Sequence, residues 1–194
     1  MHPLLVPSYV TLLLLWTTIM CYLPLSTRIM TLIGVFMMTT VVPSLCITLM
    51  SHLHIITDLR LINRHERALP YLITILCYSA TSWYFTDYHY PDWFCSTMWG
   101  ATTVTIVVCF INHWWKISGH MTGMGALLAE LTIVDQLRVE AFELYWVIIA
   151  GIIIAGMVGS ARILLGRHTL MQVIVGFFNS FFIMIIITRL MVDY

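Results

Sequence analysis

Two histidines that follow basic residues are the groups in this sequence best suited to chemistry on a phosphate. His168 lies six residues after Arg162 in the stretch "SARILLGRH", and His120 ends the stretch "KISGH". Guanidinium groups bind phosphate oxygens through planar sets of N–H donors, and backbone N–H groups at a helix start favour an anion. Gly119 lets such an anion approach because it has no Cβ. One histidine could then attack phosphorus while the other protonates the leaving oxygen, an arrangement that requires no metal.

Apolar residues dominate the elements that must carry these histidines. Hydrophobic residues fill 60% of the 194 positions and charged residues only 9%, whereas soluble domains carry about 25% charged residues. This composition predicts a multi-pass integral membrane protein. The formal net charge is zero and the nine Lys and Arg residues are scattered, which argues against a nucleic-acid partner. The apolar run in "MHPLLVPSYVTLLLLW" lacks a charged start and a cleavage site, so we expect it to be retained as a span.

The apolar runs predict a bundle of membrane-spanning helices in a single domain over residues 1–194. A crossing needs about 20 apolar residues, and the sequence shows none of the period-two alternation of a membrane barrel. Seven stretches qualify, of which the fifth is short and contains Glu130. They cover roughly residues 4–25, 29–50, 69–87, 93–115, 120–134, 143–163 and 169–191. We therefore expect an all-α polytopic membrane helix bundle with six or seven transmembrane helices.

The number of crossings between the basic clusters predicts that they share one face of the membrane. Two crossings separate the cluster before residue 68 from Lys116, and two more separate Lys116 from Arg162. Six of the nine basic residues would then lie on this face, namely Arg60, Arg64, Arg67, Lys116, Arg162 and Arg167. The same count puts the N-terminus on this face and the C-terminus on the other. A phosphorylated lipid headgroup would need such a cationic pocket at a bilayer surface.

These stretches resemble the motifs of the type 2 phosphatidic acid phosphatase superfamily, which are membrane lipid-phosphate phosphatases related in fold to vanadium haloperoxidases. The third family motif, S-R-x5-H-x3-D, is similar to "SARILLGRHTLMQ", with Arg162, His168 and then Gln172. The second motif, P-S-G-H, resembles "ISGH" at residues 117–120. The stretches "HPLLVPSY" and "ERALPYLI" are similar to a compact branch of the superfamily in Bacteroidetes-type bacteria.

The first family motif, K-x6-R-P, resembles part of "RLINRHERALP". Arg60 and Arg67 have the required spacing, Arg replaces Lys, and Pro70 comes three positions late. Arg64 competes with Arg60 for the first position of this motif. The order and lengths of the three motifs agree with the family over roughly residues 60–180.

The resemblance implies a role for each of these residues. His168 would be the nucleophile that forms a phosphohistidine, and His120 the acid that protonates the leaving group. The phosphate oxygens would be held by Arg60 or Arg64, Arg67, Ser118, Gly119 and Arg162, with Lys116 assisting from outside the motifs. Gln172 stands where the family has an aspartate that orients the nucleophilic histidine. An amide oxygen can still accept the Nδ1–H bond, although it cannot stabilise an imidazolium by charge.

The resemblance implies metal-independent hydrolysis of a lipid phosphate or lipid pyrophosphate, without a cofactor. Candidate substrates are undecaprenyl pyrophosphate, phosphatidylglycerophosphate, phosphatidate and a lipid A phosphate. Two alternatives stay open: transfer of the same phosphoryl group to an alcohol, and a non-catalytic relative that binds lipid phosphate. A haem held by His113 and His120 is a further, weaker alternative.

The expected location is a bacterial inner membrane. Counting basic residues, six against three, puts the histidine face in the cytoplasm. The resemblance favours the periplasmic face instead, and most of the six basic residues are the proposed phosphate ligands, which are selected for chemistry and not for topology.

Overall fold

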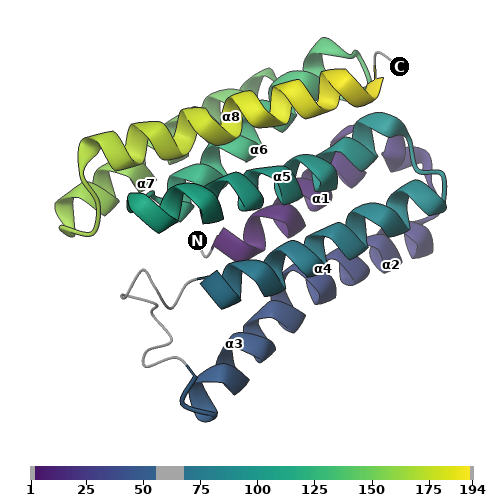
Figure 1. Ribbon diagram of the computed structural model, residues 1–194. Helices are drawn as coiled ribbons and strands as arrows, with labels where there is room; N and C mark the ends of the chain where they lie inside the picture. The colour runs from purple at the N-terminus through teal and green to yellow at the C-terminus, as the bar shows by residue number, and fades with distance from the viewer. Residues whose placement is uncertain (1–2, 56–67, 193–194) are drawn as a thin grey trace.

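The computed structural model describes residues 3–55 and 68–192, and this part of the chain is built from helices (Figure 1). The longer helices are α1 (Val6–Thr17), α2 (Leu25–Phe36), α3 (Val42–His52), α4 (Ala68–Asp87), α5 (Asp92–Trp114), α6 (Gly119–Gln136), α7 (Tyr145–Leu164) and α8 (Leu170–Val192). The short helices η1 (Pro3–Leu5) and η2 (Ile19–Tyr22) flank α1, and a π-helical segment, η3 (Met37–Val41), joins α2 to α3. The all-α bundle expected from the sequence is confirmed.

Each of the seven predicted stretches contains a helix, with α2 and α3 forming one continuous segment. The largest difference lies in the first stretch, where α1 ends at Thr17 although the apolar run continues. Thr18 has an extended backbone (φ −109°, ψ −179°). Its hydroxyl donates to the Leu14 carbonyl at 2.6 Å and accepts from the Met20 N–H at 3.2 Å. Because this side chain satisfies backbone groups at the break, the helix can end inside an apolar run.

The outer surface of the bundle is apolar. Among the described residues, four segments are long and apolar enough to cross a membrane: Leu25–His52, Asp92–Trp114, Tyr145–Leu164 and Leu170–Val192. Large apolar side chains on these segments point outward, as at Phe110 and Phe182, which are 66% and 55% exposed. Soluble monomers rarely expose contiguous apolar surface on this scale. The protein is therefore membrane-embedded.

The interior of the bundle is organised around α6, which packs against α1, α5, α7 and α8. Leu131 of α6 is buried in one core cluster with Leu14 of α1 and with Phe94 and Met98 of α5. The acidic residue Glu130 is also fully buried, and Thr97 of α5 donates a hydrogen bond of 2.7 Å to its Oε1. Apolar packing on several sides fixes the position of α6, and the first turn of this helix carries His120.

Two glycines bring α6 and α8 into backbone contact. A Cβ on Gly125 would collide with the backbone carbonyl of Phe177, and a Cβ on Gly176 would lie 2.9 Å from the carbonyl oxygen of Ser118. The Ser118 N–H also donates to the Gln172 carbonyl at 3.3 Å. Small residues of this kind let membrane helices approach closely. The contact sets the start of α6 directly beside the start of α8.

The connections that carry the two histidines lie at one end of the bundle. Figure 1 shows the N-terminal end, the α5–α6 connection and the α7–α8 connection together at this end, while the C-terminal end of α8 lies at the other. This is the arrangement predicted by counting crossings for the parts of the chain that are described. Residues 60–67, with the predicted ligands Arg60, Arg64 and Arg67, lie outside the described residues.

Candidate functional site

A cavity of about 630 Å³ opens beside the two histidines and extends between the helices. Its walls come from η1, from α1 and α3 to α7, and from the α5–α6 and α7–α8 connections. The lining residues are Pro3, Leu4, Val6, Pro7, Ile47, Pro70, Tyr71, Thr74, Tyr78, Ala101, Val104, Thr105, Val108, Lys116, Ile117, Gly119, His120, Thr122, Gly123, Ala126, Arg162, Arg167 and His168. Segments far apart in the sequence therefore form one site.

The charged and titratable residues at one end of this cavity come from the two connections and from the helix ends beside them. Lys116 and His120 belong to the α5–α6 side, and Arg162, Arg167 and His168 to the α7–α8 side. Four of these five were predicted from the sequence as site residues, whereas Arg167 was missed. The sequence had placed it among the six basic residues of the histidine face, but gave it no role in the site. The cluster is a set of cationic and titratable donors that suits a multiply charged oxyanion.

A tight turn after α7 brings His168 next to Arg162. Gly166 has φ +63°, a left-handed conformation that glycine adopts without steric cost. The N–H groups of Arg167 and His168 both donate to the Arg162 carbonyl, at 3.1 and 3.3 Å. The six-residue spacing in the sequence thus corresponds to a helix end, a reversal and the start of α8.

The side chain of Gln172 contacts the imidazole of His168 at Nδ1. Oε1 of Gln172 lies 3.1 Å from Nδ1 of His168 and also accepts from the Thr169 N–H at 3.2 Å. The Gln172 N–H lies 3.4 Å from the Thr169 hydroxyl, which completes a capping box at the start of α8. Because the backbone N–H of Thr169 identifies Oε1 as the acceptor, Nδ1 of His168 carries the proton. The lone pair is then on Nε2, which leaves this nitrogen able to act as a nucleophile.

Lys116 links the α5–α6 and α7–α8 connections through a hydrogen bond. Its Nζ donates to the carbonyl oxygen of Arg167 at 2.9 Å. The ammonium group therefore sits between the segment that carries His120 and the one that carries His168. At the same end, Nε of Arg162 is buried and has no hydrogen-bond partner among the described residues. Buried donors are normally paired, so an anion that reaches this guanidinium would complete its hydrogen bonding.

Ser118 differs from the position expected for a phosphate ligand. Its side chain is fully buried, and it is not among the residues that line the cavity. Its carbonyl accepts from the Thr122 N–H at 2.9 Å and from the Thr122 hydroxyl at 3.1 Å. Gly119, the next residue, does line the cavity. In the described residues, Ser118 therefore starts the helix, and Gly119 and His120 reach the cavity.

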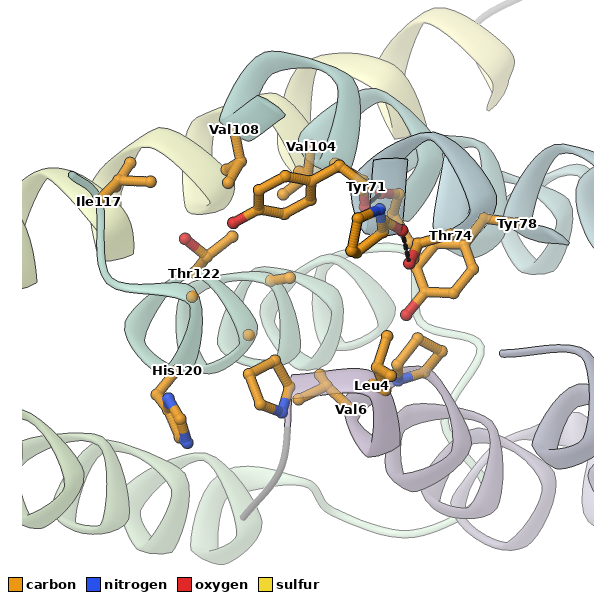
Figure 2. Close-up of a pocket in the computed structure, with 18 of the residues that line it drawn as sticks. Leu4, Val6, Tyr71, Thr74, Tyr78, Val104, Val108, Ile117, His120 and Thr122 are labelled. Carbon is orange, nitrogen blue, oxygen red and sulfur yellow. Dashed lines mark hydrogen bonds between the residues drawn. The ribbon is translucent and has the colours of Figure 1, made fainter. Parts of the chain in front are cut away.

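The other part of the cavity is apolar. Figure 2 shows Val104, Val108 and Ile117 along one side and Val6 along the other, with His120 at the lower left. Tyr71 and Tyr78 extend into this part from α4. Sequence spacing could not reveal this apolar extension, because it forms only when α1, α4, α5 and α6 pack together. A cavity that is charged at one end and apolar along the rest suits an amphiphilic ligand.

The histidines proposed as haem ligands do not face one cavity. His120 lines the cavity described above, whereas His113 lines a separate hollow with Cys109 and Phe110. His113 packs edge-on against Trp114, with ring centroids 5.1 Å apart. The described residues thus give no support to a shared ligand pair.

Comparison with known proteins gives one family match. The family model described as the PAP2 superfamily matches residues 112–194, the segment that contains His120, Arg162 and His168. No curated protein and no solved structure matches the chain. The family resemblance stated from the second and third motifs is confirmed over this segment, which does not reach the residues of the first motif.

Proposed function

We propose that this protein hydrolyses a lipid phosphate or lipid pyrophosphate through a phosphohistidine intermediate. Residues 112–194 match the PAP2 superfamily, whose members are phosphatases acting on phosphate esters. The observation that carries the proposal is the shared cavity, which has His120, Arg162 and His168 at one end and apolar side chains along the rest. We propose that residues 1–194 act as a single domain, since both halves of the chain contribute to these walls.

The first step of the proposed reaction is attack by Nε2 of His168 on phosphorus. The N–P bond forms while the bond from phosphorus to the leaving oxygen breaks, and His120 gives its proton to that oxygen. Arg162 and the Gly119 N–H donate to the phosphate oxygens, and Lys116 and Arg167 add positive charge at the same end. Stabilising the charge that develops on these oxygens is the main electrostatic contribution to phosphoryl transfer.

The second step returns His168 to its starting state. Water attacks the phosphohistidine, and His120, now deprotonated, takes a proton from that water. The P–N bond breaks and phosphate leaves. The hydrogen bond from Nδ1 of His168 to Gln172 keeps the imidazole in one tautomer through both steps. In this role Gln172 is a positioning residue. Arg60, Arg64 and Arg67 remain proposed ligands from the first motif, with Arg60 or Arg64 in its first position.

The histidine end is proposed to face the periplasm from a bacterial inner membrane, on the strength of the family resemblance. The positive-inside count of six against three carries less weight, because Lys116, Arg162 and Arg167 line the cavity. Residues that face a phosphate are retained for binding, so they are poor indicators of topology.

Phosphate release from a panel of lipids in detergent, with EDTA present, tests this function. The panel contains phosphatidate, phosphatidylglycerophosphate and undecaprenyl pyrophosphate, and His168→Ala serves as the inactive control. We expect the native protein to release phosphate with water as the only acceptor. Release only after an alcohol is added would support the phosphotransferase alternative. Binding without any release would support the non-catalytic relative, and in either case hydrolysis would be rejected.

A further inference from the structure

Lys116 contacts the peptide group that immediately precedes His168. Its Nζ donates to the carbonyl oxygen of Arg167 at 2.9 Å, and the N–H of the same peptide group, that of His168, donates to the Arg162 carbonyl at 3.3 Å. This peptide group is therefore hydrogen-bonded at both its oxygen and its nitrogen. Because the direction of a side chain depends on the backbone that carries it, these two bonds limit where the imidazole of His168 can point.

A second hydrogen bond joins the same two stretches of chain. The Ser118 N–H donates to the Gln172 carbonyl at 3.3 Å, so residues 116–118 run alongside residues 167–172. The second stretch holds both His168 and the Gln172 side chain, which lies 3.1 Å from Nδ1 of the imidazole. His168 is thus held at its backbone through Lys116 and at its ring by Gln172. Since His120 follows two residues after Ser118, the pairing also sets the two histidines relative to each other.

The turn that Lys116 contacts depends on a restraint from outside. Gly166, one residue before Arg167, has φ +63°, and glycine leaves the backbone more freedom than any other residue. A hydrogen bond from an ammonium group to a carbonyl is charge-assisted and stronger than one between neutral groups. The bond from Lys116 is therefore well suited to hold this turn in one conformation.

Lys116 and Arg162 differ in how their donors are used. Nε of Arg162 is buried and has no hydrogen-bond partner among the described residues, which leaves it for an anion. Nζ of Lys116 already donates to a neutral carbonyl, and this bond fixes the position of the ammonium group. The two cations that line one end of the cavity thus have different surroundings, and only Arg162 has a buried donor still to be paired.

We propose that Lys116 is a positioning residue, which acts by holding the Arg167 carbonyl and so the turn that presents His168, and not a direct ligand of phosphate. This inference rests on the proposed function, since it assigns Lys116 a part in the attack by His168. It replaces the expectation from the sequence that Lys116 helps to hold the phosphate oxygens.

Lys116→Met keeps most of the side chain and removes the donor, so it separates positioning from phosphate binding. Affinity for inorganic phosphate is measured in a His168→Ala background, and kcat and KM are measured with His168 present. We expect kcat to fall about 10- to 100-fold with KM unchanged, because a displacement of about 1 Å can cost about 100-fold in rate. Arg162→Met, which removes a proposed direct ligand, sets the scale for phosphate affinity, and Lys116→Met should weaken phosphate much less.

The mobility of the turn is a second readout that needs no turnover. Leu165 lies in the turn and is 64% exposed, so a spin label on Leu165→Cys, in a background without the native cysteines, reports how tightly the turn is held. Lys116→Met should make this label more mobile. Lys116→Arg, which restores a cationic donor, should restrain it again. The control Arg138→Met removes one positive charge from an exposed residue just after α6, and it should change neither mobility nor kcat.

Two results would overturn the proposal. One is a loss of phosphate affinity in Lys116→Met as large as that in Arg162→Met, which would make Lys116 a direct ligand. The other is an unchanged mobility of the label in Lys116→Met, which would show that the turn does not depend on this bond. Both are measured without turnover, so a native protein that releases no phosphate from any lipid would count against the proposed function alone.

Discussion

Oε1 of Gln172 lies 3.1 Å from Nδ1 of His168, one helical turn away, in the position where the family motif has an aspartate. The same oxygen accepts the Thr169 N–H. Gln172 therefore fixes both the start of α8 and the tautomer of His168. The Gln172 amide can orient the His168 imidazole as the carboxylate of the family motif would. It adds no negative charge beside the ring.

Gln172→Leu should lower kcat at least about 10-fold, because the imidazole then loses the acceptor that fixes its tautomer. Gln172→Asp should keep activity, and its carboxylate should stabilise the imidazolium. Since attack requires neutral Nε2, the acid limb of the kcat/KM profile should move to higher pH in Gln172→Asp.

The matched control is Gln136→Leu, because Gln136 accepts from Arg189 at 3.3 Å near the opposite ends of α6 and α8. It should leave kcat and the pH profile unchanged. Native activity in Gln172→Leu would refute the orienting role. An inactive native protein that gains activity as Gln172→Asp would identify the natural chain as a binding protein.

The two histidines should respond differently to the leaving group. His168→Ala should abolish turnover and any acid-labile phosphoenzyme on every substrate. His120→Ala should still form the phosphoenzyme slowly from an aryl phosphate, whose leaving oxygen needs no proton. General-acid help is worth about 10²- to 10⁴-fold, so the alkyl phosphate should be much more strongly affected than the aryl phosphate. Equal losses on both would argue against His120 as the acid.

Gly125→Ala should destabilise the bundle and reduce activity. The added Cβ would collide with the Phe177 carbonyl, and backbone offers no easy relaxation. Overpacking of this kind costs about 1–3 kcal/mol, and separation of α6 from α8 would also move His120 away from His168. Thermal unfolding in detergent and phosphate release measure the two effects.

Gly156→Ala provides the control for Gly125→Ala. Gly156 lies inside α7, and a Cβ added there would meet no atom within 4 Å. Because alanine favours a helix over glycine by up to about 1 kcal/mol, this variant should be as stable as the native protein or more so. A Gly125→Ala variant that behaves like Gly156→Ala would contradict the close backbone approach.

Single cysteines at the two ends of the bundle should be labelled from opposite sides of the membrane. Leu165 lies in the α7–α8 connection and Tyr88 follows α4, and both are 64% exposed. In a background without the native cysteines, an impermeant reagent added outside should label Leu165→Cys and spare Tyr88→Cys. Labelling of both cysteines from one side would contradict an odd number of membrane crossings between Tyr88 and Leu165. Labelling of Tyr88→Cys alone from outside would reject the proposal that the histidine end faces the periplasm.

The helices could be predicted from sequence because long apolar runs and polar breaks are local signals. Local pattern also grouped Arg162, His168 and Gln172, and in the structure one turn and one helix start bring them together. The burial of Ser118 could not be predicted, because it depends on the contact between α6 and α8 at Gly176. The apolar part of the cavity was missed for the same reason: its walls are joined only by tertiary packing.

The charged and apolar parts of the cavity come from different portions of the chain. Among the described residues, every charged side chain that lines the cavity lies within residues 112–194, whereas Tyr71, Tyr78, Val104 and most other apolar lining residues precede that segment. Substitutions in the first half can therefore reshape the apolar part of the cavity without touching those charged side chains. If the proposed function holds, the part of the cavity that binds phosphate and the part that accommodates the rest of the ligand can therefore change independently.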